Sequence, residues 1–361
     1  MSLIHSFKFP AIRGIQSGRE FFTVMCPLRL VPKLFTFVDE ELRPELRAQR
    51  VLNKTRIPEM ASYIVENSRN YTFSSITASI DSEYEFTPLS EENSDIGNLS
   101  ISMDCRFIIN DGQHRRAAIE EALKIKPELG SEAISVVMFI DEGLKRSQQI
   151  FSDLNRHAVR PTNSIGILFD HRDPMSCLTR EIIETVEIFN GLTEKEKTSI
   201  SNRSTKLFTL SAIHNATKVL LSKTKKNETI TQSDKEKALE FWKQVTSQMP
   251  DWKKSKERKV NSSDLREEFI HAHGVALQAL GELGRDIIRR YPKDWKKYLK
   301  GLGKVNWSRS STQTWEGKAL INGRVSKSTN SVKLTSIELK EQLNIPLSVE
   351  DKNYISRTQL Q

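Results

Sequence analysis

The sequence predicts an α+β protein with an α/β first part and a mostly helical second part. Between residues 57 and 160, segments with helical spacing of apolar residues alternate with short β-branched runs. Beyond Pro161 the long segments have helical spacing and strand signals become scarce. A chain of 361 residues is long enough for two domains. We therefore expect an α/β domain over residues 1–165 and a mainly helical, basic region over residues 166–361.

The first part contains a predicted helix and a predicted strand before its most polar segment. "RIPEMASYI" (56–64) has apolar residues three and four apart, which predicts a helix, with Pro58 in its first turn. "FSSITASI" (73–80) alternates, which predicts a half-buried strand. The acidic and polar stretch "DSEYEFTPLSEENSDIGN" (81–98) is then expected to be a loop.

The next four elements alternate between strand and helix. "CRFIIN" (105–110) and the β-branched run "ISVVMFI" (134–140) predict strands. "HRRAAIEEALK" (114–124) and "EGLKRSQQIFSDLN" (142–155) have helical spacing.

In the second part, helical spacing recurs in "CLTREIIETVEIFNGL" (177–192) and "TLSAIHNATKVLLSK" (209–223). Near the end, Thr335 precedes Glu338 by three residues, a spacing typical of a capping box, and predicts that a last helix starts there.

Charge and cysteine content limit the function classes. The formal net charge of +9 and the pI near 9.3 favour polyanion partners such as nucleic acid. Cys26, Cys105 and Cys177 are widely spaced, so neither a disulfide framework nor a zinc site is expected, and a reducing cytoplasm fits. No apolar run has the length of a membrane span and the N-terminus lacks the pattern of a signal peptide, so we expect no membrane partner and a cytoplasmic location.

The turn inside "FIINDGQHRRAAIEEAL" (107–123) concentrates polar and basic groups between a strand and a helix. Gly112 permits a tight turn, and the N-terminus of a following helix attracts anions. Arg115 or Arg116 would add a two-pronged phosphate contact, His114 a donor or a proton carrier, and Asp111 a carboxylate that orients a donor or holds a metal bound to phosphate. The alternative is that Asp111 only caps the helix while both arginines lie in solvent.

Two basic runs in the second part are candidates for DNA contact. They lie in "DWKKSKERK" (251–259) and "RRYPKDWKKYLKGLGK" (289–304), with Trp and Tyr residues among the lysines and arginines. The aromatic rings would stack on bases or anchor the helices to their own core, and the charges would contact phosphates or form a solvated face. The predicted DNA-binding residues are Lys253, Lys254, Lys256, Arg258, Lys259, Arg289, Arg290, Lys296 and Lys297.

Other patterns are less specific. His271 and His273 would point to different sides of a helix, so no metal site is expected there. "RSTKLFTLSAIHNATKVL" (203–220) would be half of a helix-turn-helix with the preceding helix, but core-facing amphipathic helices have the same spacing.

The segment "NDGQHR" (110–115) resembles the signature of the DGQHR-domain family. Its neighbours match that family too: "RVLNKTRIPEMASYI" and "FSSI" upstream, then "VVMFI" and "IFSDLNRHAVRPT" downstream. With the tail "WEGKALINGRVSKSTNSVKLTSIELKEQL", the resemblance covers most of the chain and is strongest to the DndB family of bacterial DNA phosphorothioation systems.

The DGQHR-domain family in turn resembles the ParB and sulfiredoxin superfamily, in which the equivalent turn contacts nucleotide phosphates. This resemblance implies a phosphate-facing turn made of Asp111, Gly112, Gln113, His114 and Arg115, approached by Asn155, Arg156 and His157. Gln113 stands where sulfiredoxin carries its reactive cysteine, so thiol chemistry is not expected at the turn. A bound nucleotide, ATP or CTP, is the cofactor that this resemblance suggests.

Three hypotheses for function follow. The resemblance to the DndB family implies a repressor that binds double-stranded DNA and controls a phosphorothioate modification operon, with a homodimer expected by analogy to other operator-binding proteins. The alternative is a ParB-like accessory protein that binds or hydrolyses a nucleotide triphosphate; the absence of a Walker motif excludes a P-loop ATPase only. The third is an interaction subunit that contacts other proteins of the modification system.

Overall fold

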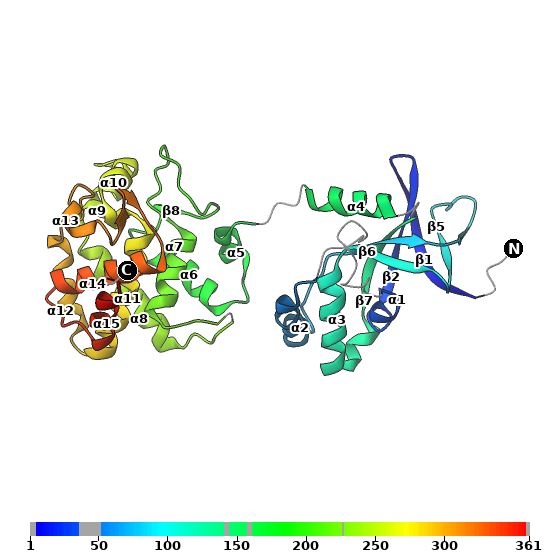
Figure 1. The fold of residues 1–361 in the computed structure, drawn as a ribbon, viewed down its shortest axis with the longest axis horizontal. Helices are drawn as coiled ribbons and strands as arrows, with labels where there is room; N and C mark the ends of the chain where they lie inside the picture. The colour runs from blue at the N-terminus through cyan, green and yellow to red at the C-terminus, as the bar shows by residue number, and fades with distance from the viewer. Residues whose placement is uncertain (1–4, 36–51, 141–143, 157–160, 226, 359–361) are drawn as a thin grey trace. The chain divides into compact units, whose positions relative to one another are not determined.

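The structure is a computed structural model that describes residues 5–35, 52–140, 144–156, 161–225 and 227–358. The chain forms two compact units, residues 1–159 and 160–361, each with its own hydrophobic core (Figure 1). The first unit combines a sheet with helices and the second is mostly helical, so the predicted α+β class is confirmed.

The N-terminal unit is built on a seven-stranded sheet with the order β4-β5-β1-β2-β7-β3-β6. Neighbouring strands are antiparallel except for β3 and β7, which are parallel. The strands are β1 (Ser6–Gln16), β2 (Arg19–Pro27), β3 (Ile76–Asp81), β4 (Tyr84–Pro88), β5 (Ile96–Ser102), β6 (Arg106–Asp111) and β7 (Ala133–Ile140).

Two strands lie where the sequence predicted a loop. Residues 81–98 contain β4 and the start of β5. β4 is an edge strand that is largely exposed, and it ends in Pro88. Because an edge strand needs little apolar surface and tolerates charges and proline, its sequence resembles that of a loop.

β3 is more deeply buried than its alternation predicted. Its first five residues are all buried, including the polar Ser79. The hydroxyl of Ser79 donates to Asn110 Oδ1 at 2.9 Å, and Asn110 Nδ2 donates to the carbonyl of Ser147 at 3.2 Å. This polar face is therefore covered by the helix that carries Ser147, and hydrogen bonding offsets the cost of burying it.

Helices pack on both faces of this sheet (Figure 1). α2 and α3 pack against each other, and Ala118 and Ile119 of α3 share the core with the apolar face of β3. α4 packs along β6. The helices of this unit are α1 (Val31–Leu34), η2 (Lys54–Arg56), α2 (Ile57–Glu66), α3 (Gln113–Ile125), η3 (Pro127–Ser131) and α4 (Leu144–Arg156).

The C-terminal unit is organised around the long helix α11, which packs against α7 and α14. Gly281 on α11 allows the close approach, since a Cβ atom there would lie 2.4 Å from the carbonyl oxygen of Ala216 on α7. The helices are α5 (Asn163–Phe169), α6 (Pro174–Thr185), α7 (Leu210–Leu220), α8 (Gln232–Ser247), α9 (Pro250–Lys256), α10 (Ser262–Glu268), η4 (Ile270–Ala272), α11 (Gly274–Arg290), α12 (Trp295–Leu299), η5 (Leu302–Lys304), α13 (Thr312–Trp315), α14 (Thr329–Gln342) and α15 (Val349–Thr358). Two short ribbons pair β8 (Thr193–Glu194) with β9 (Phe208–Thr209) and β10 (Leu320–Ile321) with β11 (Arg324–Val325).

The predicted helix start at Thr335 is wrong. α14 begins at Thr329, and the side chain of Ser328 caps it by accepting a hydrogen bond from the backbone N–H of Ser331. Thr335 is fully buried inside the helix, where its hydroxyl donates to the carbonyl of Ser331 at 2.6 Å. The Thr-x-x-Glu spacing therefore lies inside the helix, with Thr335 facing the core, and does not mark a helix start.

Neither a membrane span nor a metal cluster occurs in the described residues. None of the described helices combines the length and the apolarity that a bilayer crossing requires. Across the same part of the chain, no three His, Cys, Asp or Glu side chains gather as a metal site would require.

Candidate phosphate-binding turn and nucleic-acid interface

The turn between β6 and α3 is built around Gly112. Its φ of 112° lies in the left-handed region, and an added Cβ atom would lie 3.0 Å from Cγ1 of Ile76. α3 starts at the next residue and runs for 13 residues without a side-chain cap. The positive end of its dipole and its first backbone N–H groups are therefore placed at the turn, as an anion site requires.

Asp111 does not cap α3. Instead its carboxylate accepts a hydrogen bond of 2.8 Å from Nη2 of Arg115, one helical turn later. The same nitrogen donates to the carbonyl of Ser75 at 3.0 Å. Arg115 is thereby fixed between β3 and the start of α3, with 17% of its side chain exposed, so the alternative in which it lies in solvent does not hold.

Gln113 and His114 form the first turn of α3. The backbone N–H of Asn53 donates to Nε2 of His114 at 3.1 Å, so this ring nitrogen is an acceptor. Gln113 is buried, and its side-chain nitrogen has no hydrogen-bond partner among the described residues. The N-terminus of α3 thus lies at the turn, and His114 holds the segment before α2 in place.

Arg116 points away from the turn and into the core. Its Nε donates to the carbonyl of Phe35 at 2.8 Å, its Nη2 donates to the carbonyl of Pro32 at 2.9 Å, and Glu120 pairs with its Nη1. Only 7% of its side chain is exposed. In this position Arg116 is neither a phosphate ligand at the turn nor a solvated side chain. Its hydrogen bonds join α3 to the segment around α1.

The residues predicted to approach the turn lie at the far end of α4. Ser147 contacts Asn110 beside the turn, and Asn155 follows eight residues later, about 12 Å along the helix at 1.5 Å per residue. Asn155 is exposed and its side-chain amide donates to the carbonyl of Phe151. Arg156 is also exposed, and no described contact brings it to the turn. His157 lies outside the described residues.

The positive charge of the protein is concentrated in the C-terminal unit. Residues 160–361 contain 36 Lys and Arg against 24 Asp and Glu, a net charge of +12. Residues 1–159 contain 19 Lys and Arg against 22 Asp and Glu, a net charge of −3. The excess of +9 is therefore a property of the helical unit, where both predicted DNA-binding runs lie.

The first basic run lies on the short helix α9 and on the residues directly after it. Lys253, Lys254, Arg258 and Lys259 are exposed, and Lys256 is half-buried, with its ammonium donating to the carbonyl of Asn190. Lys254 pairs with Asp251 at 3.1 Å and Lys259 with Glu257 at 2.7 Å, both near the surface. Exposed pairs of this kind contribute at most about 1 kcal/mol, so the lysines remain able to exchange their carboxylates for phosphates.

The second basic run spans the end of α11 and α12. Arg289 and Arg290 are exposed, and Arg290 donates to the carbonyl of Pro346 at 2.6 Å. Lys296 pairs with Glu240 on α8 at 2.6 Å, and Lys297 with Asp294 at 3.4 Å.

The aromatic residues of both runs have clear positions. Trp252 and Trp295 are buried in the core, and Trp252 Nε1 donates to Nδ1 of His271 at 2.9 Å. Tyr291 and Tyr298 stack on each other with their ring centroids 4.5 Å apart. The two tryptophans therefore anchor α9 and α12, as the alternative to base stacking proposed.

Comparison with known families decides the identity of the chain. The sequence profile of the family described as DndB, DNA-sulfur modification-associated, matches residues 9–346. The chain belongs to the DndB family. The match runs from β1 to the segment after α14, so both units are part of the DndB architecture and the predicted family is confirmed.

Membership of the DndB family connects the protein with DNA sulfur modification. No curated protein and no solved structure matches the chain. The expected likeness of the N-terminal unit to ParB and sulfiredoxin thus stays a prediction.

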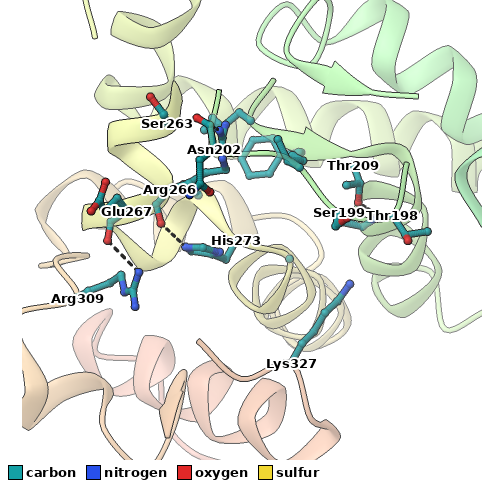
Figure 2. Close-up of a pocket in the computed structure, with 16 residues that line it drawn as sticks. Thr198, Ser199, Asn202, Thr209, Ser263, Arg266, Glu267, His273, Arg309 and Lys327 are labelled. Carbon is teal, nitrogen blue, oxygen red and sulfur yellow. Dashed lines mark hydrogen bonds between the residues drawn. The ribbon is translucent and has the colours of Figure 1, made fainter. Parts of the chain in front are cut away.

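One site of this DndB family member was not predicted from its sequence. A polar cavity of about 470 Å³ lies in the C-terminal unit, lined among others by Arg266, His273, Arg309 and Lys327 (Figure 2). These residues come from the end of α10, the start of α11, the loop before α13 and the segment before α14. Single basic residues tens of positions apart give no local pattern, and the position of His273 in the sequence suggested only the question of a metal ligand.

Proposed function

We propose that the protein is a DNA-binding transcriptional repressor of a DNA phosphorothioate modification operon, and that its C-terminal unit contacts double-stranded DNA. The observation that carries this proposal is the charge difference between the units, +12 against −3. DNA affinity depends on neutralising phosphates with lysine and arginine. Membership of the DndB family supplies the connection with DNA sulfur modification.

The exposed charges of residues 253–259 are the first candidates for phosphate contact. Lys253 and Arg258 are exposed and form no ion pair with a described carboxylate, so DNA would meet them without first breaking a pair. Phosphate contacts of this kind fix register and orientation, and base contacts would come from other side chains.

The repressor proposal is tested by a footprint of the full-length protein on the DNA upstream of its own gene. A protected segment of defined length, which disappears when that segment is replaced by unrelated sequence, is expected. Deletion of the gene should raise transcription of the neighbouring modification genes. Equal protection of all DNA without a defined segment, together with unchanged transcription, would reject the repressor and favour a general DNA-binding subunit that works with other proteins of the system.

We also propose that the protein binds its operator as a homodimer. This rests on the symmetry of operators recognised by helical proteins, whose half-sites mirror a two-fold axis. Light scattering of the complex with operator DNA should give, after the mass of the DNA is subtracted, a protein mass of twice 41.4 kDa. A strictly monomeric mass, free and bound, would reject the dimer.

The turn at Gly112 supports a second candidate function, binding or hydrolysis of a nucleotide such as ATP or CTP. The uncapped N-terminus of α3 and the fixed guanidinium of Arg115 are the observations in its favour. Binding of ATP and CTP should then fall about ten-fold or more in Arg115→Ala. If that variant loses nucleotide and keeps DNA, the nucleotide function gains over simple repression; loss of DNA alone would place the turn on the DNA backbone.

A further inference from the structure

The polar cavity of the C-terminal unit is assembled from segments far apart in the sequence (Figure 2). Thr198, Ser199 and Asn202 come from the segment between β8 and β9. Arg266 and His273 flank η4, while Arg309 and Lys327 approach from two later segments. At about 470 Å³ the cavity has the size of small-molecule sites, which span roughly 300 to 1,000 Å³.

Three cations line this cavity. Arg266, Arg309 and Lys327 form no ion pair with any carboxylate of the described residues. The guanidinium of Arg266 donates instead to the backbone carbonyls of residues 201, 202, 204 and 206. Glu267 supplies the carboxylate of the lining, so the charges at the cavity sum to a positive excess.

Arg266 and Arg309 have structural roles beside their charge. Arg266 holds the 201–206 segment, of which Asn202 lines the cavity. Arg309 donates from Nη1 to the carbonyl of Glu267 and from Nη2 to that of Gly323, both at 3.0 Å. Arg266 therefore acts on a ligand mainly through its charge, whereas the described contacts of Arg309 use two of its five N–H donors.

His273 is neutral in this setting. Burial lowers its pKa to about 4, and the charges of Arg309 and Arg266 act in the same direction. Its Nε2–H donates to the carbonyl of Arg266 at 2.6 Å. An anion in the cavity would oppose the arginine charges and raise the pKa of His273, which offers a spectroscopic signal for occupancy.

Lys327 has its whole ammonium group available to a ligand, since no described hydrogen bond or ion pair engages it. It lies against the first residue of α11, where a Cβ atom added to Gly274 would come 3.1 Å from both Cε and Nζ of Lys327. The absence of a side chain at Gly274 thus leaves room for Lys327 beside the N-terminus of a 17-residue helix.

We propose that this cavity binds a small phosphorylated ligand of the nucleoside monophosphate class, with its phosphate at Lys327 and the start of α11. The excess positive charge selects an anion. A volume well beyond that of one phosphate leaves space for the rest of the ligand, and Leu207, Phe208 and Ala272 give the lining an apolar part that suits a base or sugar. The proposal goes beyond repression and does not depend on it.

The proposal is tested by titrating the full-length protein with AMP, inorganic phosphate and adenosine in a calorimeter. AMP should bind more tightly than either of its parts. Lys327→Ala should weaken AMP binding about ten-fold or more, because it removes a charge-assisted contact. Lys327→Arg should bind AMP more tightly than Lys327→Ala, because arginine keeps the positive charge. Lys304→Ala, which removes an exposed lysine outside the cavity lining, is the matched control and should bind AMP like wild type.

A second variant separates binding from folding. Gly274→Ala should displace the Lys327 side chain and weaken AMP binding while leaving the helix as stable as in wild type, because alanine is the better helix former. The NMR-measured pKa of His273 should rise when AMP binds to wild type and should not rise in Lys327→Ala.

Three results would overturn the proposal. The first is AMP binding that is no tighter than phosphate binding. The second is AMP binding that survives Lys327→Ala and is lost in Arg115→Ala, which would assign the nucleotide to the turn in the other unit. The third is a loss of DNA affinity in Lys327→Ala as large as the loss of AMP affinity, which would make the cavity part of a DNA-binding surface.

Discussion

Arg115 and Arg116 are neighbours in the sequence and have different environments. On a helix with 3.6 residues per turn they project about 100° apart, so one lies beside the turn and the other faces the core. Arg115 joins Asp111 to the carbonyl of Ser75. Arg116 satisfies the carbonyls of Phe35 and Pro32. The sequence placed both in a polar turn, but only packing determines which guanidinium stays at the turn.

Replacement of Gly112 tests the geometry of the turn. Gly112→Ala should destabilise the N-terminal unit by about 1 to 3 kcal/mol, because its φ of 112° is strained for other residues and its Cβ would press on Ile76. Urea unfolding measures the difference. Gly166→Ala on α5 is the control, since a Cβ there meets nothing within 4 Å, and it should be neutral or slightly stabilising. Wild-type stability in Gly112→Ala would contradict the described backbone.

A double-mutant cycle tests whether Asp111 is an ion-pair partner or a helix cap. The pair of Asp111 with Arg115 predicts a coupling energy of up to about 1 kcal/mol between Asp111→Ala and Arg115→Ala. Arg115→Ala should also cost more than Asp111→Ala, because it leaves the carbonyl of Ser75 without its donor. A coupling energy of zero, with Asp111→Asn as stable as wild type, would instead support Asp111 as a helix cap.

At the level of elements, a buried ionic network connects α11, α14 and α15. The ammonium of Lys340 on α14 donates to Asp286 on α11 at 2.6 Å and to Asp351 on α15 at 2.8 Å. Lys333 donates to the other oxygen of Asp351 at 2.7 Å. Lys340 and Asp351 are 2% and 1% exposed, so each depends on its partner for solvation.

This network predicts a loss of stability in acid. Burial alone would raise the pKa of Asp351, but hydrogen bonds from Lys333 and Lys340 hold it well below the ordinary value. A lowered pKa in the folded state contributes stability above the unfolded value of about 3.9, and that stability is lost as the pH falls further. Asp351→Asn should cost about 3 to 5 kcal/mol at pH 7, because it breaks a buried pair.

Denaturant unfolding between about pH 2 and pH 7, the range that spans the unfolded carboxyl pKa, measures this effect. The Asp351→Asn variant should depend less on pH than wild type in the acidic part of that range. Asp294→Asn, at a pair with Lys297 whose Asp294 side chain is 67% exposed, is the matched control and should change stability by less than about 1 kcal/mol. If wild type and Asp351→Asn lose stability equally in acid, the network does not contribute to the stability of the unit.

The elements show where sequence patterns suffice. α2, α3, β6 and β7 match their predictions because each carries the apolar spacing of its own secondary structure. The prediction of a loop over residues 81–98 missed β4, because a strand at the edge of the sheet requires little apolar surface. The start of α14 was misplaced because a Thr-x-x-Glu spacing does not reveal which residue faces the core.

At the scale of the whole molecule, the charge distribution can be read from the sequence and the cavity cannot. The basic helical region was predicted, and its net charge of +12 belongs to the structural unit formed by residues 160–361. The cavity with Arg266, His273, Arg309 and Lys327 was not predicted, because its residues meet only after α7, α10, α11 and α14 have packed. A site assembled by tertiary contacts leaves no spacing in a single sequence.

The salt dependence of DNA binding shows whether the C-terminal unit contacts the DNA. Joint replacement of Lys253, Lys254 and Lys259 by alanine should weaken binding to all DNA sequences and flatten the slope of log affinity against log salt by about 0.9 for each phosphate that the protein no longer neutralises. The control replaces Lys8, Lys33 and Lys124, which are exposed on the N-terminal unit, with the same change in net charge. We expect a flatter slope for the first variant and the wild-type slope for the control. The reverse, or equal slopes in all three proteins, would rule out DNA contact by residues 253–259 of the C-terminal unit.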